Sequence, residues 1–127
     1  MASLNRVQLI GRLGKDPESR NTPKGTSYTT FSLAVGRKWK NKNGELNEDT
    51  DWFNIIAWGK LGEICQKYLT KGKLVYLEGR LRTRKYEHEG TTRYFTTVVL
   101  SAVQMLEPKP KETVIEEVGE PEEEIPE

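Results

Sequence analysis

Two tryptophans stand six residues apart in the stretch DWFNIIAWGK, residues 51–60, of a chain that contains three. Side chains of a β-strand alternate between its two faces, so Phe53, Ile55 and Ala57 would point to one side. Trp52 and Trp58 would point to the opposite side. The first set has the composition of a core face. The face that normally meets water therefore carries two indole rings whose role has to be explained.

Basic residues surround these tryptophans and two further aromatic residues outside the expected core, Trp39 and Tyr86. Unpaired bases need flat apolar surfaces to replace their lost stacking, and stacking on an aromatic ring is worth ~1–3 kcal/mol per base, whatever the base. Phosphates need Lys and Arg. The combination predicts a surface for a single strand of nucleic acid. Its basic members are Arg37, Lys38, Lys40, Lys42, Lys60, Lys71, Lys73, Arg80, Arg82, Arg84 and Lys85.

A structural explanation is the alternative for each of these residues. Tryptophans on the second face of a strand can pack against another subunit or beneath a loop. The basic run from Arg80 to Lys85, taken alone, is typical of a solvated strand edge that discourages aggregation. Three tryptophans and a tyrosine, all beside cations, favour nucleic-acid binding for the group as a whole.

Catalytic chemistry finds no support in the sequence. The single histidine, His88, lies in the turn EHEG, and the single cysteine, Cys65, belongs to the apolar side of an expected helix. The phosphate-binding pattern G-x-x-x-x-G-K-[ST] is absent. Asp49 and Asp51 are close in sequence, but acidic pairs in loops are usually solvated. We therefore expect a protein that is not an enzyme and that holds neither a metal nor another cofactor.

Charge divides this chain of 127 residues into two parts. Residues 1–106 hold 18 Lys and Arg against 10 Asp and Glu, a net charge of +8, whereas residues 107–127 hold 2 Lys against 9 Glu, a net charge of −7. A basic body with an acidic tail indicates a polyanionic partner. A single cysteine, the lack of a membrane-length apolar stretch and the lack of signal-peptide features predict a cytoplasmic protein.

The periodicity of apolar residues predicts three strands, one helix and two more strands. Gly36 is expected to mark a bulge, the polar stretch KNKNGELNEDT a loop or hairpin tip, and Gly72 the end of the helix. In the strand after the helix, Val75, Leu77, Gly79 and Leu81 are expected to face inward. The helix would bury an apolar stripe formed by Leu61, Ile64, Cys65, Tyr68 and Leu69. The strands are expected in residues 4–14, 28–39, 51–58, 73–86 and 91–106, and the helix in 60–72.

Strands and helices do not alternate, so a doubly wound parallel sheet is disfavoured. The pattern predicts an all-β fold with one helix, namely a five-stranded oligonucleotide-binding (OB) barrel with the order β-β-β-α-β-β and the helix at one end. Residues 1–106 would form this domain. Residues 107–127, rich in Pro and Glu, would form a flexible, disordered acidic tail.

Three motifs in this order, LNRVQLIGRLGKDPE, TDWFNIIAWGKLGEICQKYLTKG and LVYLEGRLRTRKY, resemble the bacterial single-stranded DNA-binding proteins, the tetrameric OB-fold family. The resemblance covers residues 4–106. It implies a homotetramer in which the first strand, NRVQLIGRL, contributes to a subunit interface. It also implies that DNA stacks on Trp39, Trp52, Trp58 and Tyr86, and that Lys42, Lys60, Lys71, Arg82, Arg84 and Lys85 line the DNA path.

The end of the chain departs from the family pattern. Family members usually end in an acidic tip that closes with IPF and recruits replication, recombination and repair proteins, whereas this chain ends EEEIPE. Glu127 therefore replaces the terminal aromatic residue, and one apolar anchor of the recruitment site is missing. The glutamates could also compete with DNA for the basic groove. The residues that match the partner-binding tip are Glu122, Glu123, Glu124, Ile125 and Pro126.

The sequence thus predicts a protein that binds and protects single-stranded DNA, with little sequence preference, during DNA replication, recombination and repair. Its location would be cytoplasmic and nucleoid-associated. The alternatives are an OB-fold module for RNA or for a primosome assembly, and an accessory interaction protein whose tryptophans fill a protein interface.

Overall fold

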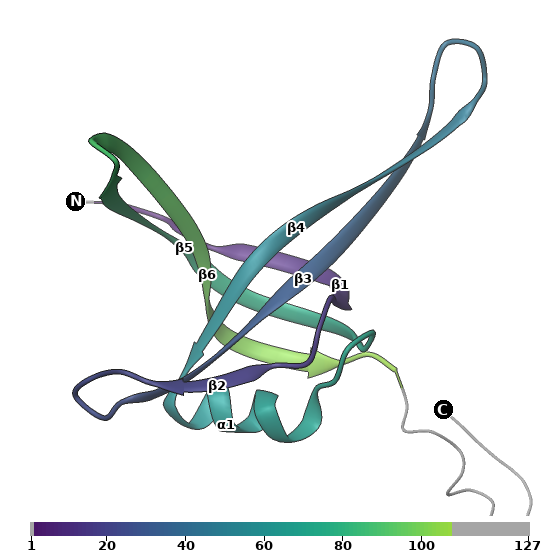
Figure 1. Ribbon diagram of the computed structural model, residues 1–127. Helices are drawn as coiled ribbons and strands as arrows, with labels where there is room; N and C mark the ends of the chain where they lie inside the picture. The colour runs from purple at the N-terminus through teal and green to yellow at the C-terminus, as the bar shows by residue number, and fades with distance from the viewer. Residues whose placement is uncertain (1, 108–127) are drawn as a thin grey trace, which may run out of the picture.

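The computed structural model describes residues 2–107, which form a small barrel with two long hairpins that extend from it (Figure 1). Segments of alternating apolar residues provide most of the strand residues of the barrel, and the single stretch with helical periodicity forms the helix. The elements are β1 (Val7–Leu13), β2 (Glu18–Asn21), β3 (Ser27–Lys40), β4 (Leu46–Trp58), α1 (Gly59–Tyr68), β5 (Leu74–His88) and β6 (Thr91–Met105).

The barrel closes through β1, which pairs with two different strands. Val7 to Arg12 pair with β5, and Arg12 and Leu13 also pair with β3. The circuit β1–β5–β6–β4–β3 then returns to β1, with β4 and β6 parallel and the other pairs antiparallel. The short strand β2 pairs with β3 outside this circuit. The predicted five-stranded OB barrel with one helix is confirmed.

The core lies inside the barrel and is built from the inward positions of each strand. Leu33, Ile55, Val75 and Leu77 are almost fully buried there. α1 covers the lower end of the barrel in Figure 1, below β2 and β3. Within residues 2–107, no helix is long and apolar enough to cross a membrane.

Two contacts hold α1 against the barrel. The hydroxyl of Thr29 on β3 donates a hydrogen bond of 2.9 Å to the carbonyl oxygen of Gly62 in the helix. Cys65 and Leu69 are buried beneath the barrel, and burial raises the pKa of the Cys65 thiol to about 11. The apolar stripe is narrower than predicted, because Ile64 and Tyr68 are exposed.

Several local predictions were wrong. The polar stretch from Leu46 to Thr50 belongs to β4, so the hairpin tip comprises only residues 41–45. The pairing of β3 with β4 is continuous through Gly36 and Thr50, and no bulge interrupts it. α1 ends at Tyr68, and Gly72, with φ +87°, lies in the turn that follows. The long ladder between β3 and β4 explains the first two departures, because it imposes strand structure on polar residues.

The bulge of the barrel lies instead between β5 and β6. Glu78 pairs with Ala102 and Gly79 pairs with Leu100, so Ser101 is the extra residue. A Cβ atom on Gly79 would come within 2.3 Å of the carbonyl oxygen of Val99, so the strands approach more closely than a larger residue permits. Beyond this point the hairpin leaves the barrel, and Leu81, predicted to face inward, is 43% exposed.

A polar cluster on the outer side of β1 and β5 predicts a pH-dependent contribution to stability. The Glu78 carboxylate accepts hydrogen bonds from the Tyr76 hydroxyl and, at 2.8 Å, from Arg6. The Tyr76 bond is the main cause that lowers the pKa of Glu78 from its ordinary value of 4.5. A carboxylate with a lowered pKa stabilises the folded state above its unfolded pKa, and this contribution is lost as the pH falls through the folded value.

We therefore expect the melting temperature of the wild type to fall more steeply with acidification below about pH 4.5 than that of Glu78→Gln. Thermal unfolding followed by circular dichroism between neutral and acid pH measures this difference. Tyr76→Phe removes only the hydroxyl that donates to Glu78, so its melting temperature should fall less steeply with acidification than that of the wild type. Parallel curves for the wild type and Glu78→Gln would contradict the prediction.

Candidate nucleic-acid interface

Three strands place an aromatic and basic row across the outer face of the barrel. Trp58 on β4 pairs directly with Tyr28 on β3, which in turn pairs with Arg20 on β2. Directly opposed residues of neighbouring strands project from the same face of the sheet. The rings of Tyr28 and Trp58 lie with their centroids 5.0 Å apart and their planes tilted by 42°. Trp58 is 39% exposed.

A groove of about 600 Å³ runs from this row across β4 to β6 and β5. Arg82 and Arg84 enter it from β5, where Arg84 stands directly opposite Phe95. The floor holds the uncharged polar side chains of Ser32, Asn54 and other residues. The groove is lined by Lys15, Arg20, Thr22, Tyr28, Thr30, Phe31, Ser32, Asn54, Ile55, Ile56, Trp58, Arg82, Arg84, Phe95, Thr97 and Val99.

Trp52 lies on the same face of β4 as Trp58, six residues earlier, which corresponds to roughly 20 Å along the strand. It is the most exposed tryptophan, with 61% of its surface accessible. The indole rests against Gly14, because a Cβ atom on that glycine would lie 2.4 Å from the ring. Gly14 therefore provides the close backbone surface on which the ring lies.

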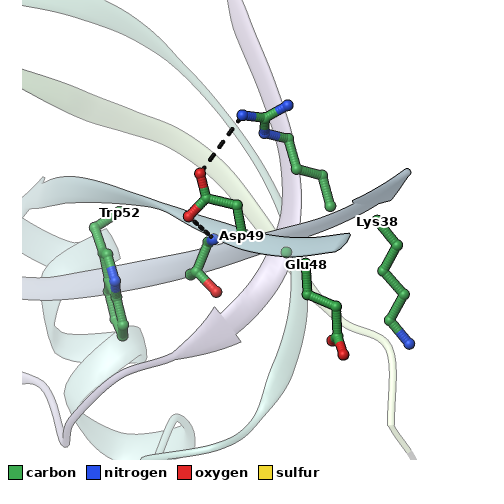
Figure 2. Close-up of a pocket in the computed structure, with 7 residues that line it drawn as sticks. Lys38, Glu48, Asp49 and Trp52 are labelled. Atoms are coloured by element: carbon green, nitrogen blue, oxygen red, sulfur yellow. Dashed lines mark hydrogen bonds and ion pairs between the residues drawn. The ribbon is translucent and has the colours of Figure 1, made fainter. Parts of the chain in front are cut away.

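Trp52 also borders a second hollow, of about 580 Å³, along the β3–β4 hairpin (Figure 2). Figure 2 shows Trp52, Glu48 and Lys38 on one side of the hairpin, and Asp49 on the other side. Lys38 and Glu48 are directly opposed in the ladder. The surroundings of Trp52 therefore carry both signs of charge, whereas Arg82 and Arg84 give the groove at Trp58 a basic wall.

Trp39 does not share the face of Trp52 and Trp58. It pairs with Asn47, which lies on the opposite face of β4 by alternation. The Arg37 guanidinium stacks over the Trp39 ring at 4.8 Å from its centroid.

The same Arg37 is 3.5 Å from the Asp49 carboxylate and 3.7 Å from that of Asp51. The two aspartates, expected to be merely solvated, thus hold the arginine that covers one face of Trp39. The ion pairs are exposed, so each contributes little to the stability of the fold.

The remaining predicted aromatic residue, Tyr86, lies near the end of the β5–β6 hairpin. It alternates in phase with Arg82 and Arg84 and is directly opposite Arg93. Its ring is exposed and lies outside the residues that line the groove. Lys85 projects from the other face of the hairpin, opposite Tyr94.

The predicted lysines are more scattered than the arginines. Lys42 lies at the tip of the β3–β4 hairpin, Lys60 in the first turn of α1 and Lys71 in the turn after the helix. All three are exposed, and none of them lines the groove at Trp58. Of the ten residues predicted to bind DNA, the structure brings Trp58, Arg82 and Arg84 together in one groove.

Sequence reasoning missed four groove residues, Lys15, Arg20, Tyr28 and Phe95. Arg20 donates a hydrogen bond of 2.9 Å to Glu18, and this contact lowers the pKa of the Glu18 carboxyl. Lys15 lies 3.5 Å from the same carboxylate. β2 is short and fully exposed, so it has no apolar alternation by which it could be recognised.

Metal-binding geometry is not found in the part of the chain that the structure describes. Within residues 2–107, no three His, Cys, Asp or Glu side chains are grouped so that they could hold an ion. The predicted tip residues Glu122, Glu123, Glu124, Ile125 and Pro126 lie outside the described residues, as does nearly all of the predicted tail.

The closed barrel, with its exposed aromatic and basic groove, defines an OB-fold binding protein. The family model of the single-strand binding protein family matches residues 4–106, and the chain belongs to this family. This membership agrees with the prediction that the chain is not an enzyme.

Relatives and solved structures agree with this family. The chain is 49% identical over 105 residues to single-stranded DNA-binding protein 1 of Chlorobaculum tepidum, covering 81% of this chain and 65% of the relative. It is 48% identical over 105 residues to the single-stranded DNA-binding protein of Neisseria meningitidis serogroup A, covering 82% of this chain and 60% of the relative. The chain thus spans less than two thirds of the length of these relatives.

Among solved structures, the Plasmodium falciparum SSB complex with ssDNA superposes with a TM-score of 0.77 at 34% identity, covering 84% of this chain and 98% of that chain. A deletion mutant of the single-stranded DNA binding protein from Thermus aquaticus superposes with a TM-score of 0.72 at 30% identity. The match covers 84% of this chain and 52% of the Thermus chain.

Proposed function

We propose that this protein binds single-stranded DNA with little sequence preference, by stacking bases on exposed aromatic rings and pairing phosphates with Lys and Arg. The observation that carries the proposal is the groove in which Trp58 lies with Arg82 and Arg84. The Plasmodium protein, whose fold this chain shares, is described in complex with ssDNA. The relatives from Chlorobaculum and Neisseria are named single-stranded DNA-binding proteins.

The mechanism follows from what the two kinds of side chain can do. Every base has a π-face, so stacking on Trp52 and Trp58 tolerates any sequence, and a duplex hides these faces. Lys and Arg side chains that contact phosphates displace the counterions that surround the nucleic acid, and the release of these counterions favours binding. We assign stacking to Trp39, Trp52, Trp58 and Tyr86, and phosphate contacts to Lys42, Lys60, Lys71, Arg82, Arg84 and Lys85. The supporting geometry is strongest for Trp58, Arg82 and Arg84.

The wider biology belongs to the same proposal. We infer that residues 1–106 form the DNA-binding domain and that the protein acts in DNA replication, recombination and repair in the cytoplasm. Residues 107–127 would form a tail that contacts partner proteins through Glu122–Pro126. A homotetramer is supported by β1. Among the described residues, Val7 to Gly11 pair on one side only, with β5, which leaves an edge for a second copy.

A titration of intrinsic tryptophan fluorescence with oligo-dT, at low and at high salt, tests the proposal. We expect deep quenching. In a plot of the logarithm of the binding constant against the logarithm of the salt concentration, the slope should be about −0.7 for each phosphate contacted. Duplex DNA of the same length should compete poorly, and oligo-rU compared with oligo-dT separates DNA from RNA binding. An absence of both quenching and binding at low salt would overturn the proposal.

A further inference from the structure

Tyr28 occupies a central position in the groove that the sequence did not reveal. It lies directly between Trp58 and Arg20 in the ladder, so the three side chains form one row across β4, β3 and β2. Its ring is only partly buried, and it does not belong to the hydrophobic cluster that fills the barrel. Core packing therefore does not explain an aromatic side chain at this position.

The contact of Tyr28 with Trp58 leaves both rings accessible to a ligand. Their planes are tilted by 42°, with centroids 5.0 Å apart, so neither ring covers the face of the other as parallel stacking would. Within the described residues, the Tyr28 hydroxyl makes no hydrogen bond to a protein group. A tyrosine hydroxyl is both a donor and an acceptor, and it remains available in the groove.

Phe95 is a second aromatic side chain of the same groove that has no place in the core. It is 40% exposed, stands directly opposite Arg84 on β5 and is absent from the barrel's hydrophobic cluster. An exposed phenylalanine ring makes no favourable polar interaction with water. Thr96, the next residue in the strand, projects from the other face of the hairpin. The ring is thus free to meet an apolar ligand that enters from the groove.

Cations stand at both sides of these rings. Arg20 is at the β2 side, where its pairing with Glu18 holds it in place, and Arg82 and Arg84 are at the β5 side. The volume of about 600 Å³ lies within the range of pockets that hold small organic ligands. Aromatic surfaces between cations suit a base whose flanking phosphates lie on either side of it.

We propose that this groove is a base-binding subsite in which Tyr28 and Phe95 act, together with Trp58, as stacking surfaces for nucleobases of single-stranded DNA. The inference rests on the proposed function and extends it, because it adds two contact residues that lie outside the ten positions assigned above. It also predicts that DNA crosses the sheet from β2 to β5 at this point.

Binding of fluorescein-labelled oligo-dT to Tyr28→Ala and Phe95→Ala, measured by fluorescence anisotropy at one salt concentration, tests the proposal. Each substitution should weaken binding by roughly fivefold to a hundredfold, the range of one lost base–aromatic contact. Two exposed tyrosines outside the groove provide matched controls, Tyr94→Ala beside Phe95 and Tyr68→Ala on α1. Both controls should bind like the wild type.

Two further variants separate stacking from support of Trp58. Tyr28→Phe keeps the ring and should bind within about twofold of the wild type, whereas Tyr28→Leu keeps apolar bulk without a ring and should lose affinity as Tyr28→Ala does. The slope of affinity against salt should stay unchanged in all of them, because no cation is removed. Full affinity of Tyr28→Leu would overturn the role of Tyr28 as a stacking surface.

Photo-cross-linking of the wild type to oligonucleotides that contain 5-iodouracil adds a direct measure of contact. Cross-links at Tyr28 or Phe95 are expected in the mass spectrum of the digested complex. If Trp58→Ala weakens binding while Tyr28→Ala and Phe95→Ala bind like the controls, the subsite is overturned and the proposed function stands. If the wild type does not bind oligo-dT, the proposed function itself fails, and the subsite with it.

Discussion

Alanine in place of both Trp52 and Trp58 is expected to weaken binding of fluorescein-labelled oligo-dT by roughly thirtyfold or more. Each ring offers a stacking surface worth ~1–3 kcal/mol per base. The two residues are six positions apart on one face of β4, roughly 20 Å, so their effects should add. The combined loss would then be about 2–6 kcal/mol. Anisotropy of the labelled strand is the suitable measurement, because the variant retains a single tryptophan.

The controls for this experiment are built into the chain. Tyr68→Ala and Tyr94→Ala remove exposed rings that do not line the groove, and neither should change the affinity. The salt slope of the double variant should equal that of the wild type, whereas Arg82→Ala or Arg84→Ala should reduce it by about 0.7. A double variant that binds as tightly as the wild type would show that these tryptophans are not the stacking surfaces.

Alanine at Gly79 is expected to lower the free energy of unfolding by roughly 2–3 kcal/mol, the upper range for an added methyl group in a closely packed site. Its Cβ atom would lie 2.3 Å from the Val99 carbonyl oxygen and 3.0 Å from the carbonyl carbon. These are backbone atoms, so the clash is relieved only if β5 and β6 move apart at the bulge. Urea denaturation at neutral pH measures the loss.

Gly36→Ala is the matched control for this substitution. Gly36 also lies within a strand ladder, but a Cβ atom there would have no neighbour closer than the Asp49 carbonyl oxygen at 4.0 Å. The free energy of unfolding should therefore change by less than about 1 kcal/mol, because alanine meets no clash here and has less conformational entropy to lose on folding than glycine. Equal effects of the two substitutions would contradict the close approach seen at Gly79.

The elements with strict alternation could be predicted from sequence, and those set by long-range pairing could not. Leu33 and Ile55 are recognisable as core residues because each belongs to an alternating apolar set, Phe31, Leu33 and Val35 in one strand and Phe53, Ile55 and Ala57 in the other. β2 carries no such signal, since all four of its residues are exposed and its existence depends on the edge of β3. The extension of β4 to Leu46 likewise follows from the ladder with β3, which overrides the polar composition of that segment.

In the candidate site, too, local alternation could be read from the sequence and long-range strand pairing could not. Trp52 and Trp58 could be found because alternation within one strand places both on the outer face. Tyr28 could not be joined to them, because its position beside Trp58 depends on the register between β3 and β4. Trp39 is a second example, since only the register shows that it lies on the other face of the β3–β4 ladder from Trp52 and Trp58.

The burial of Cys65 has a practical consequence for experiments that attach a label to this protein. Thiol reagents react with the thiolate, and a pKa of about 11 leaves almost none of it at neutral pH. The Cys65 side chain is also fully buried on α1, so reagents cannot reach it. The chain contains no other cysteine. A cysteine introduced at Asn43, on the tip of the β3–β4 hairpin, would therefore be labelled selectively by a maleimide dye. The native sequence is thus already suited to single-molecule fluorescence measurements on that hairpin in the presence and absence of oligo-dT.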